Sequence, residues 1–223
     1  MPTGHSRSAG ALPWIPLVAL STAAAYLAAR YDDIPERWPV HWDLAGNPNG
    51  ESTRSIPGVF GLLVLGLVIW VLLEIMAAVM LARGKPELLP VRIANVRLMR
   101  MVSASTSVLF AGLSVSLPLG PHVPPVVIVV LAFALIGAPL ALGSRRLKQA
   151  MAEVRAAGHA DAVRGYHGLY YSNPDDARLW VPKLGGGGLT VNFAHRWAWP
   201  VVVLLVVAPP VVAVGAMLVL SHR

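Results

Sequence analysis

The chain contains no cysteine, which excludes disulfide bonds, thiol catalysis, thiolate metal sites and iron–sulfur clusters. Charge is also scarce: Asp, Glu, Lys and Arg make up 13% of the 223 residues, against about 25% in soluble domains. Neither an HExxH spacing nor a glycine-rich phosphate loop occurs. Apolar residues, in contrast, make up 56% of the chain. This composition predicts a multi-pass membrane protein.

Five apolar runs are long enough to cross a bilayer as helices, which rise about 1.5 Å per residue. They cover residues 12–29, 57–82, 98–118, 123–143 and 199–220. The first run is longer than the core of a signal peptide, so we expect it to be retained. The connection between the third and fourth runs is short, which favours an antiparallel pair. The sequence therefore predicts an all-α membrane protein with five transmembrane helices.

Basic residues are unevenly distributed over the connecting loops. Loop 30–56 has three and loop 119–122 has none, whereas loop 83–97 has four and loop 144–198 has eight. The positive-inside rule places the two more basic loops in the cytoplasm, with the amino terminus inside and the carboxy terminus outside. The formal net charge is +7. Because these bases border apolar runs, they predict contact with anionic lipid headgroups and no direct binding of nucleic acid.

These features divide the chain into five parts. They are an N-terminal tail with the first helix (1–30), an extracytoplasmic loop domain (31–56), helices two to four (57–143), a cytoplasmic segment (144–198) and the fifth helix (199–223).

The cytoplasmic segment begins with an amphipathic stretch. In residues 144–164 the apolar positions Leu147, Met151 and Val154 share one helical face. This pattern predicts either an extension of the fourth helix or a helix lying on the headgroups. Three short runs follow, at 168–172, 178–182 and 189–193, and their turn residues and alternation predict a small three-stranded β-meander.

The extracytoplasmic loop carries His41, Trp42 and Asp43, which we consider candidates for contact with a ligand or partner. In an extended chain His41 and Asp43 point the same way. This suits either a ligand or metal contact, or a structural hydrogen bond of His41 within a turn-rich loop. One histidine and one aspartate are too few for a zinc site, and we predict no metal and no other cofactor.

Glu74 is the only ionisable residue deep within an apolar run. Charges inside a membrane are costly and commonly mark functional sites. Ser103, Thr106 and Ser107 of the next run reach a similar depth. Glu74 is therefore either part of a proton or ion relay or a peptide contact, or a protonated group that hydrogen-bonds to these hydroxyls and joins two helices.

The last polar stretch, 165–199, combines turns, aromatic residues and two tryptophans that precede the fifth run. Its candidate residues are Asn173, Pro174, Asp175, Asp176, Arg178, Pro182, Lys183, Asn192 and Phe193. The acidic pair either contacts a ligand or belongs to a turn held by its own side-chain hydrogen bonds to the backbone, which is the more common role. We expect Trp197 and Trp199 at the membrane interface.

Two stretches resemble known families. Residues 34–55 resemble the extracytoplasmic domain of unknown function of SdpI-type bacteriocin immunity proteins, through Pro39, His41, Trp42, Gly46, Pro48 and Arg54, whereas Asn49 replaces a common acidic residue. Residues 168–199 are similar to a second uncharacterised module, through its ordered Tyr, Asn-Pro-Asp-Asp, Arg, Val-Pro-Lys and Thr-x-Asn-Phe elements. The resemblance implies a bacterial inner-membrane protein; SdpI-type members protect their host from a secreted peptide toxin, and some sequester a transcriptional repressor.

Three functions are compatible with these features. The leading hypothesis is a non-enzymatic multi-pass inner-membrane protein of the immunity or sensor type. Its outer loop would meet an extracellular peptide or envelope signal, and its cytoplasmic module would contact a protein partner or the inner leaflet. The alternatives are a small transporter or permease component that uses Glu74, and a membrane enzyme with His41 and Asp43 at its site.

Overall fold

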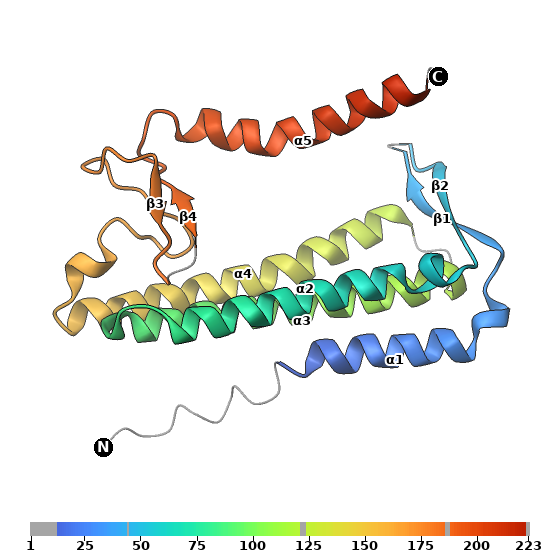
Figure 1. Ribbon diagram of the computed structural model, residues 1–223, viewed down its shortest axis with the longest axis horizontal. Coiled ribbons are helices and arrows are strands. Elements are labelled where there is room, and N and C mark those ends of the chain that lie inside the picture. The colour runs from blue at the N-terminus through green and yellow to red at the C-terminus, as the bar shows by residue number, and fades with distance from the viewer. Residues whose placement is uncertain (1–12, 44, 121–123, 186–187, 222–223) are drawn as a thin grey trace. The chain divides into compact units, whose positions relative to one another are not determined.

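The computed structural model describes residues 13–43, 45–120, 124–185 and 188–221, most of which are helical (Figure 1). The α-helices of this part of the chain are α1 (Ile15–Ala29), α2 (Ile56–Ala82), α3 (Leu89–Leu119), α4 (Pro125–Ala156) and α5 (Ala198–Ser221). The strands are β1 (Arg37–Trp42), β2 (Pro48–Thr53), β3 (Trp180–Pro182) and β4 (Leu189–Val191). Single turns of 3₁₀-helix cover Tyr31–Asp33, Pro86–Leu88 and Ala160–Val163.

Three helices in the described part of the chain are long and apolar enough to cross a membrane. They span Ile56–Ala82, Pro86–Leu119 and Val126–Ala156. Helix α1 has 15 residues, fewer than the roughly 20 that a span needs. Helix α5 counts among the shorter apolar helices over Ala198–Pro209. The membrane class predicted from the sequence is therefore supported, whereas five spans and their orientation stay predictions.

The chain divides into two compact units, and the first comprises the residues up to Arg83 together with Arg92–Arg146. Its core joins α1, α2 and α3 to the base of the β1–β2 hairpin, through Leu27, Trp38, Leu63 and Ala111 among others. Helix α2 approaches α1 and α3 closely at Gly66. A Cβ atom added to this glycine would lie 3.0 Å from the Phe110 ring of α3 and 3.1 Å from the Leu20 side chain of α1. Small residues at such crossings let membrane helices pack by van der Waals contact.

Helix α2 has a defined cap at each end. Ser55 precedes it and accepts a hydrogen bond from the Gly58 N–H at 3.2 Å, which satisfies one of the free donors of the first turn. At the other end the buried Arg92 guanidinium donates to the carbonyls of Leu81 at 3.2 Å and Arg83 at 2.8 Å. A cation at this position also stabilises the negative end of the helix dipole. The sequence had suggested only a topogenic role for Arg92.

Strands β1 and β2 form an antiparallel β-hairpin, which the sequence interpretation as a turn-rich loop had missed. Strands β1 and β2 pair from Arg37↔Thr53 to Trp42↔Pro48, with irregularities on both sides of His41. Asp43 holds the turn, because its carboxylate accepts from the N–H groups of Ala45 at 2.9 Å and Asn47 at 2.8 Å. This local hydrogen bonding is typical of Asx turns.

Helices α3 and α4 run antiparallel, as their short connection predicted. At one end of the pair, Gly143 of α4 lies so close to Leu98 of α3 that an added Cβ atom would collide with the Leu98 side chain. At the other end, Ile128 near the start of α4 and Leu117 near the end of α3 line the same pocket. The connecting residues 121–123 lie outside the described residues. The two helices thus bring their opposite ends together at the hairpin.

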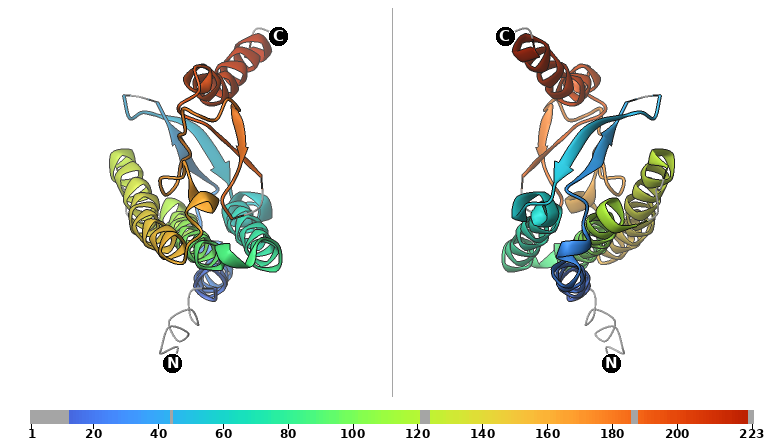
Figure 2. Two further views of the ribbon diagram at one scale, coloured as in Figure 1. Left: turned by 90° about the vertical axis from the view of Figure 1, so that its left-hand side faces the viewer. Right: turned by 90° about the vertical axis from the view of Figure 1, so that its right-hand side faces the viewer.

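The second unit comprises Gly84–Val91 and the residues from Leu147 onward. Helix α4 continues to Ala156, which confirms the extended-helix alternative for this stretch. Leu147, Met151 and Val154 are buried, as their shared helical face predicted. After a 3₁₀ turn the chain enters a small module, residues 165–197, which leads directly into α5 (Figure 2).

The module contains two paired strands among its described residues, so the predicted three-stranded meander is wrong. Strands β3 and β4 pair antiparallel with Val181 opposite Thr190. The expected strand 168–172 is absent, and Tyr171 makes only single bridges, to Tyr166 and Asn192. Gly165 and Gly168 have φ of 77° and 89°. This left-handed backbone turns the chain back on itself and prevents an extended run.

Candidate functional site

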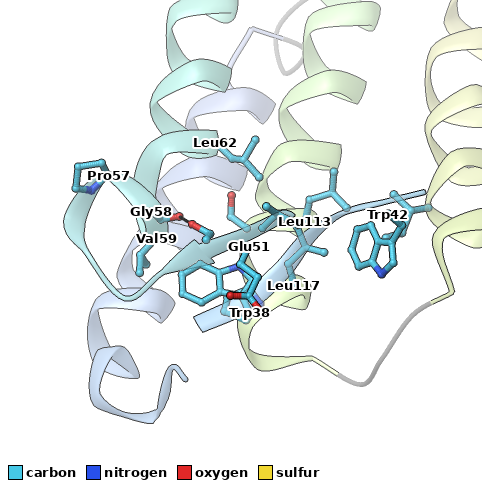
Figure 3. Close-up of a pocket in the computed structure, with 14 residues that line it drawn as sticks. Trp38, Trp42, Glu51, Pro57, Gly58, Val59, Leu62, Leu113 and Leu117 are labelled. Carbon is cyan, nitrogen blue, oxygen red and sulfur yellow. Dashed lines mark hydrogen bonds between the residues drawn. The ribbon is translucent and has the colours of Figure 1, made fainter. Parts of the chain in front are cut away.

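A pocket of about 410 Å³ lies in the first unit between the hairpin and the helix ends beneath it. Figure 3 shows Leu113 and Leu117 of α3 between the indoles of Trp38 and Trp42, with Leu62 of α2 above them. The pocket is lined by Trp38, Val40, Trp42, Glu51, Ser52, Pro57, Gly58, Val59, Leu62, Leu113, Ser114, Leu117, Pro118 and Ile128. Its size falls in the range of about 300–1,000 Å³ that is common for ligand sites, and apolar side chains dominate its wall.

The alternation of strand β1 builds one wall of this pocket. Trp38, Val40 and Trp42 are two residues apart, so they share one face of the strand, and all three line the pocket. Trp38 is buried and belongs to the core of the first unit. His41 lies on the opposite face and is exposed. Of the predicted contact residues in this loop, only Trp42 therefore faces the pocket.

Two polar features distinguish the pocket wall. The Trp42 Nε1–H is buried and has no hydrogen-bond partner among the described residues. An isolated buried donor costs about 1–3 kcal/mol. At the rim, the Glu51 carboxylate pairs with the exposed Arg37 guanidinium at 3.7 Å. The pocket thus combines an apolar interior with a charged rim.

His41 and Asp43 have structural partners instead of a shared site. His41 Nδ1 donates to Asn49 Oδ1 across the hairpin. Backbone and side-chain hydrogen bonds from Asn47 hold the pKa of Asp43 below its usual value, because they stabilise the carboxylate. Within the described residues no group of three or more His, Cys, Asp or Glu side chains could hold a metal ion.

Glu74 is paired with Arg100 between α2 and α3. The Arg100 Nε–H donates to both carboxylate oxygens at 3.2 Å, and Nη2 donates to Oε2 at 3.0 Å. Both side chains are 25% exposed. The sequence interpretation had proposed the hydroxyls of Ser103, Thr106 and Ser107 as partners, and the actual partner lies one turn before them on α3. Guanidinium and carboxylate in this fork geometry satisfy each other's charge.

The module of the second unit is organised around Asn192, whose side chain is fully buried. Its Nδ2 donates to the carbonyls of Asn173 at 2.9 Å and Asp176 at 2.8 Å, and its Oδ1 accepts from the N–H groups of Asn173 at 3.0 Å and Ala194 at 3.1 Å. All four hydrogen-bonding positions of the amide are therefore used. One side chain thereby ties the Asn-Pro-Asp-Asp turn to the residues after β4.

Asp176 and its neighbours complete this turn. Its carboxylate accepts from the Arg178 guanidinium at 2.8 and 2.9 Å, from the Arg178 N–H at 3.1 Å and from the Tyr171 hydroxyl at 2.9 Å. The Asp175 N–H donates to Asn173 Oδ1 at 3.0 Å. The turn is thus held by its own side chains, which was the more common of the two roles weighed from the sequence.

We expect the module to be insensitive to pH down to about pH 4, the ordinary pKa of an aspartate in an unfolded chain. Hydrogen bonds from Arg178, and then from Tyr171, hold the pKa of folded Asp176 well below that value. The stability contributed by Asp176 is fully present above the unfolded pKa and is lost as pH falls toward the folded pKa. Hydrogen exchange of module amides from pH 7 to pH 3 checks this. In Asp176→Asn the module amides should be less protected from exchange at pH 7 than in the wild-type protein, and their protection should fall less as the pH is lowered. An equal fall in protection in both proteins would contradict this prediction.

A row of aromatic rings runs along the module toward α5. His167 stacks on Tyr170 with centroids 5.3 Å apart, Tyr170 meets Phe193 at 6.1 Å, and Phe193 meets Trp199 at 5.6 Å. Lys183 and Pro182 are exposed near the β3–β4 turn. The predicted module residues are thus close in space, with Asn192 and Asp176 structural and Phe193 in the aromatic row.

Comparisons with known proteins identify two regions. Residues 17–67, which include most of α1, the hairpin and the start of α2, match a family described as a domain of unknown function (DUF1648). Residues 174–199 match a family of unknown function (DUF5808). No curated protein and no solved structure matches the chain. Both descriptions agree with an uncharacterised membrane protein, and neither carries the immunity function that the resemblance implied.

Proposed function

We propose that this protein is a non-enzymatic, multi-pass protein of the bacterial inner membrane, of the immunity or sensor type, that binds an apolar ligand beneath its β1–β2 hairpin. The observation that carries the proposal is the pocket of about 410 Å³, with two tryptophans and several aliphatic side chains in its wall. In the five-pass, N-in threading the hairpin faces the extracytoplasmic side, where a secreted peptide or an envelope component arrives.

The ion pair between Glu74 and Arg100 favours this binding function over the transporter alternative. A carboxylate that relays protons needs freedom to exchange them, whereas the Glu74 carboxylate is held by the Arg100 guanidinium through both of its oxygens. The hydrogen bonds of His41 and Asp43 within the hairpin likewise support a binding surface more than a catalytic one. In this proposal the DUF5808-matching module contacts a cytoplasmic protein or the inner leaflet.

A gene deletion with complementation tests the proposal. Deletion should change the sensitivity of cells to envelope-active peptides, or the transcription of neighbouring genes, and the wild-type gene should restore both. Leu117→Trp adds an indole inside the pocket, so it should fail to restore the response at an equal level of membrane-inserted protein. Val130→Trp is the matched control, because Val130 is exposed on α4 and lies outside the pocket lining.

Two outcomes would count against the proposal. Deletion that changes neither peptide sensitivity nor the transcriptome would remove the immunity or sensor role. Full restoration by Leu117→Trp would show that the function does not use the pocket.

A further inference from the structure

One face of the small β3–β4 sheet in the module is apolar and largely exposed. Antiparallel pairing sets Trp180 opposite Val191 and Pro182 opposite Leu189. Because side chains alternate along a strand, these four residues share one face of the sheet. Val191 is buried, whereas Trp180 and Leu189 are 44% and 57% exposed. Large apolar side chains that gather on an exposed face mark a contact surface.

The aromatic row leads from the module into helix α5. Phe193, two residues beyond Val191, contacts the exposed ring of Tyr170. It also contacts Trp199, which lies in the first turn of α5 and is 64% exposed. Further along the helix, the aliphatic side chains of residues 203–206 are exposed as well. Exposed apolar side chains thus occur on the sheet, on the aromatic row and on α5.

Two bases without an acidic partner flank these apolar residues. Lys183 directly follows β3 at the turn of the sheet, where its N–H donates to the Gly188 carbonyl at 3.0 Å. Arg196 lies just before α5, with its guanidinium 5.9 Å from the centre of the Trp197 ring. Both side chains are exposed, and neither forms an ion pair with a residue that the structure describes. The module therefore presents a cation at each end of its apolar surface.

We propose that this surface docks the module on the anionic headgroups of a phospholipid bilayer. Trp180, Leu189 and Trp197 enter the interfacial layer, where tryptophan is favoured because its ring is apolar and its N–H is a donor. Lys183 and Arg196 bind lipid phosphates beside them. The inference deepens the proposed function and rests on it, because that function gives the module either a protein or a leaflet as partner, and the lipid is named here.

A soluble protein partner fits the apolar residues less well. The ring of Trp199 carries the aromatic row into α5, whose exposed residues 203–206 are all aliphatic. In a protein with membrane-spanning helices, lipid covers such a helix surface. A partner in water that covered Tyr170 and Phe193 would have to end at Trp199. A bilayer, in contrast, covers the module and the start of α5 with one continuous apolar layer.

The charges of the module favour the same occupant. Asp176 is already neutralised by Arg178 at 2.8 Å. Asp175 is then the one carboxylate of residues 165–197 without a basic partner, against the two bases Lys183 and Arg196. A surface with this excess of bases beside exposed tryptophans is complementary to lipid phosphates.

The test places one spin label in the full-length protein, which is simple because the chain has no cysteine. Leu189→Cys carries the nitroxide on the apolar face, and Ala177→Cys carries it at an exposed turn position outside that face. Each protein is reconstituted in nanodiscs of phosphatidylcholine, with or without phosphatidylglycerol. Oxygen concentrates in the bilayer and a water-soluble nickel chelate stays outside it, so their relative effects on the label give its depth. With phosphatidylglycerol, the label at position 189 should be shielded from nickel, and the label at position 177 should not.

Removal of the two bases should weaken docking without unfolding the module. Lys183→Gln with Arg196→Gln should lower the ratio of docked to free modules about 25-fold, since each base near an anionic leaflet contributes about fivefold. The two components in the spectrum of the label at position 189 measure this ratio. Arg145→Gln with Lys148→Gln removes the same charge from exposed positions of α4 and should leave the ratio unchanged.

Hydrogen exchange shows whether each variant is folded. The amides of Asn173 and Ala194, which bond to Asn192 Oδ1, should keep their protection in every protein compared. Lost docking with protected amides then reports on the lipid contact alone.

Two results would overturn the inference. A label at position 189 that is open to nickel in both lipid mixtures would show that the module does not dock on lipid and would leave it to a protein partner. Equal shielding in both mixtures, unchanged by the glutamine substitutions, would remove the recognition of anionic headgroups. The Leu117→Trp cell assay is independent of both. A defect there with an open label leaves the ligand-binding function standing, whereas full restoration with a shielded label ends the role of the pocket and leaves the docked module.

Discussion

Replacing Glu74 by alanine should strongly destabilise the protein. The substitution leaves the Arg100 guanidinium, which is only 25% exposed, without its bidentate partner. Removing one member of a buried pair typically costs about 3–5 kcal/mol, because the remaining charge is left uncompensated. The free energy of unfolding in mixed micelles of mild detergent and dodecyl sulfate measures the effect. Arg100→Ala should cost a similar amount.

A double substitution separates the uncompensated charge from lost packing. Glu74→Leu with Arg100→Leu removes both charges, and such replacements are often neutral or stabilising. We expect the double variant to regain most of the stability that either alanine variant loses. Glu153→Ala, which removes an exposed carboxylate from α4, is the matched control and should change stability by less than about 0.5 kcal/mol. A double variant as unstable as the single ones would show that the charge is not the cause.

Replacing Asn192 by alanine should disorder the module of residues 165–197. The change removes four hydrogen bonds at once and leaves the partly buried carbonyls of Asn173 and Asp176 without their donor. Each unsatisfied buried group costs about 1–3 kcal/mol, so a loss of several kcal/mol is expected for a unit with such short strands. Hydrogen exchange of the full-length protein in nanodiscs reports this loss amide by amide.

The exchange pattern distinguishes local from global effects. The amides of Asn173 and Ala194 bond directly to Asn192 Oδ1, so they should lose protection in Asn192→Ala first. The amides of Ser172 and Phe193 bond to backbone carbonyls and should follow only if the whole module opens. Asp175→Ala removes an exposed carboxylate at the tip of the same turn and should leave protection unchanged. Unaltered protection of Ser172 and Phe193 in Asn192→Ala would contradict the organising role.

The helical part of the fold followed from the sequence because apolar length is a strong local signal. The runs at 57–82 and 98–118 each became part of a long helix, as did the run at 123–143 from Pro125 onward, and the apolar face with Met151 is buried. The hairpin was missed because its prolines and glycines indicate turns, while its pairing joins residues that are distant in the sequence, such as Arg37 and Thr53. The period of Trp38, Val40 and Trp42 was the available signal for a strand with one apolar face.

The candidate sites were predicted less completely, since a site depends on which elements meet. Glu74 was identified from its cost in lipid, but hydroxyl groups were predicted as its partners, whereas its actual partner Arg100 lies near the start of the same 98–118 run. Arg92 and Arg100 lie in the same basic stretch of the sequence. Such a stretch indicates the orientation of a helix in the membrane and gives no sign of an ion pair. The pocket unites β1, β2, α2, α3 and α4, and local periodicity carries no information about such a junction.

The ion pair between α2 and α3 also bears on how the protein enters the membrane during synthesis. The window of α3 has a mean hydropathy of 1.5, against 2.7 for the windows of α2 and α4. A segment with Arg92, Arg97 and Arg100 in its first turns partitions poorly by itself, because each arginine opposes transfer from the translocon. Once Glu74 on the preceding segment neutralises Arg100, that opposition decreases. Helices α2 and α3 should therefore leave the translocon as a paired unit.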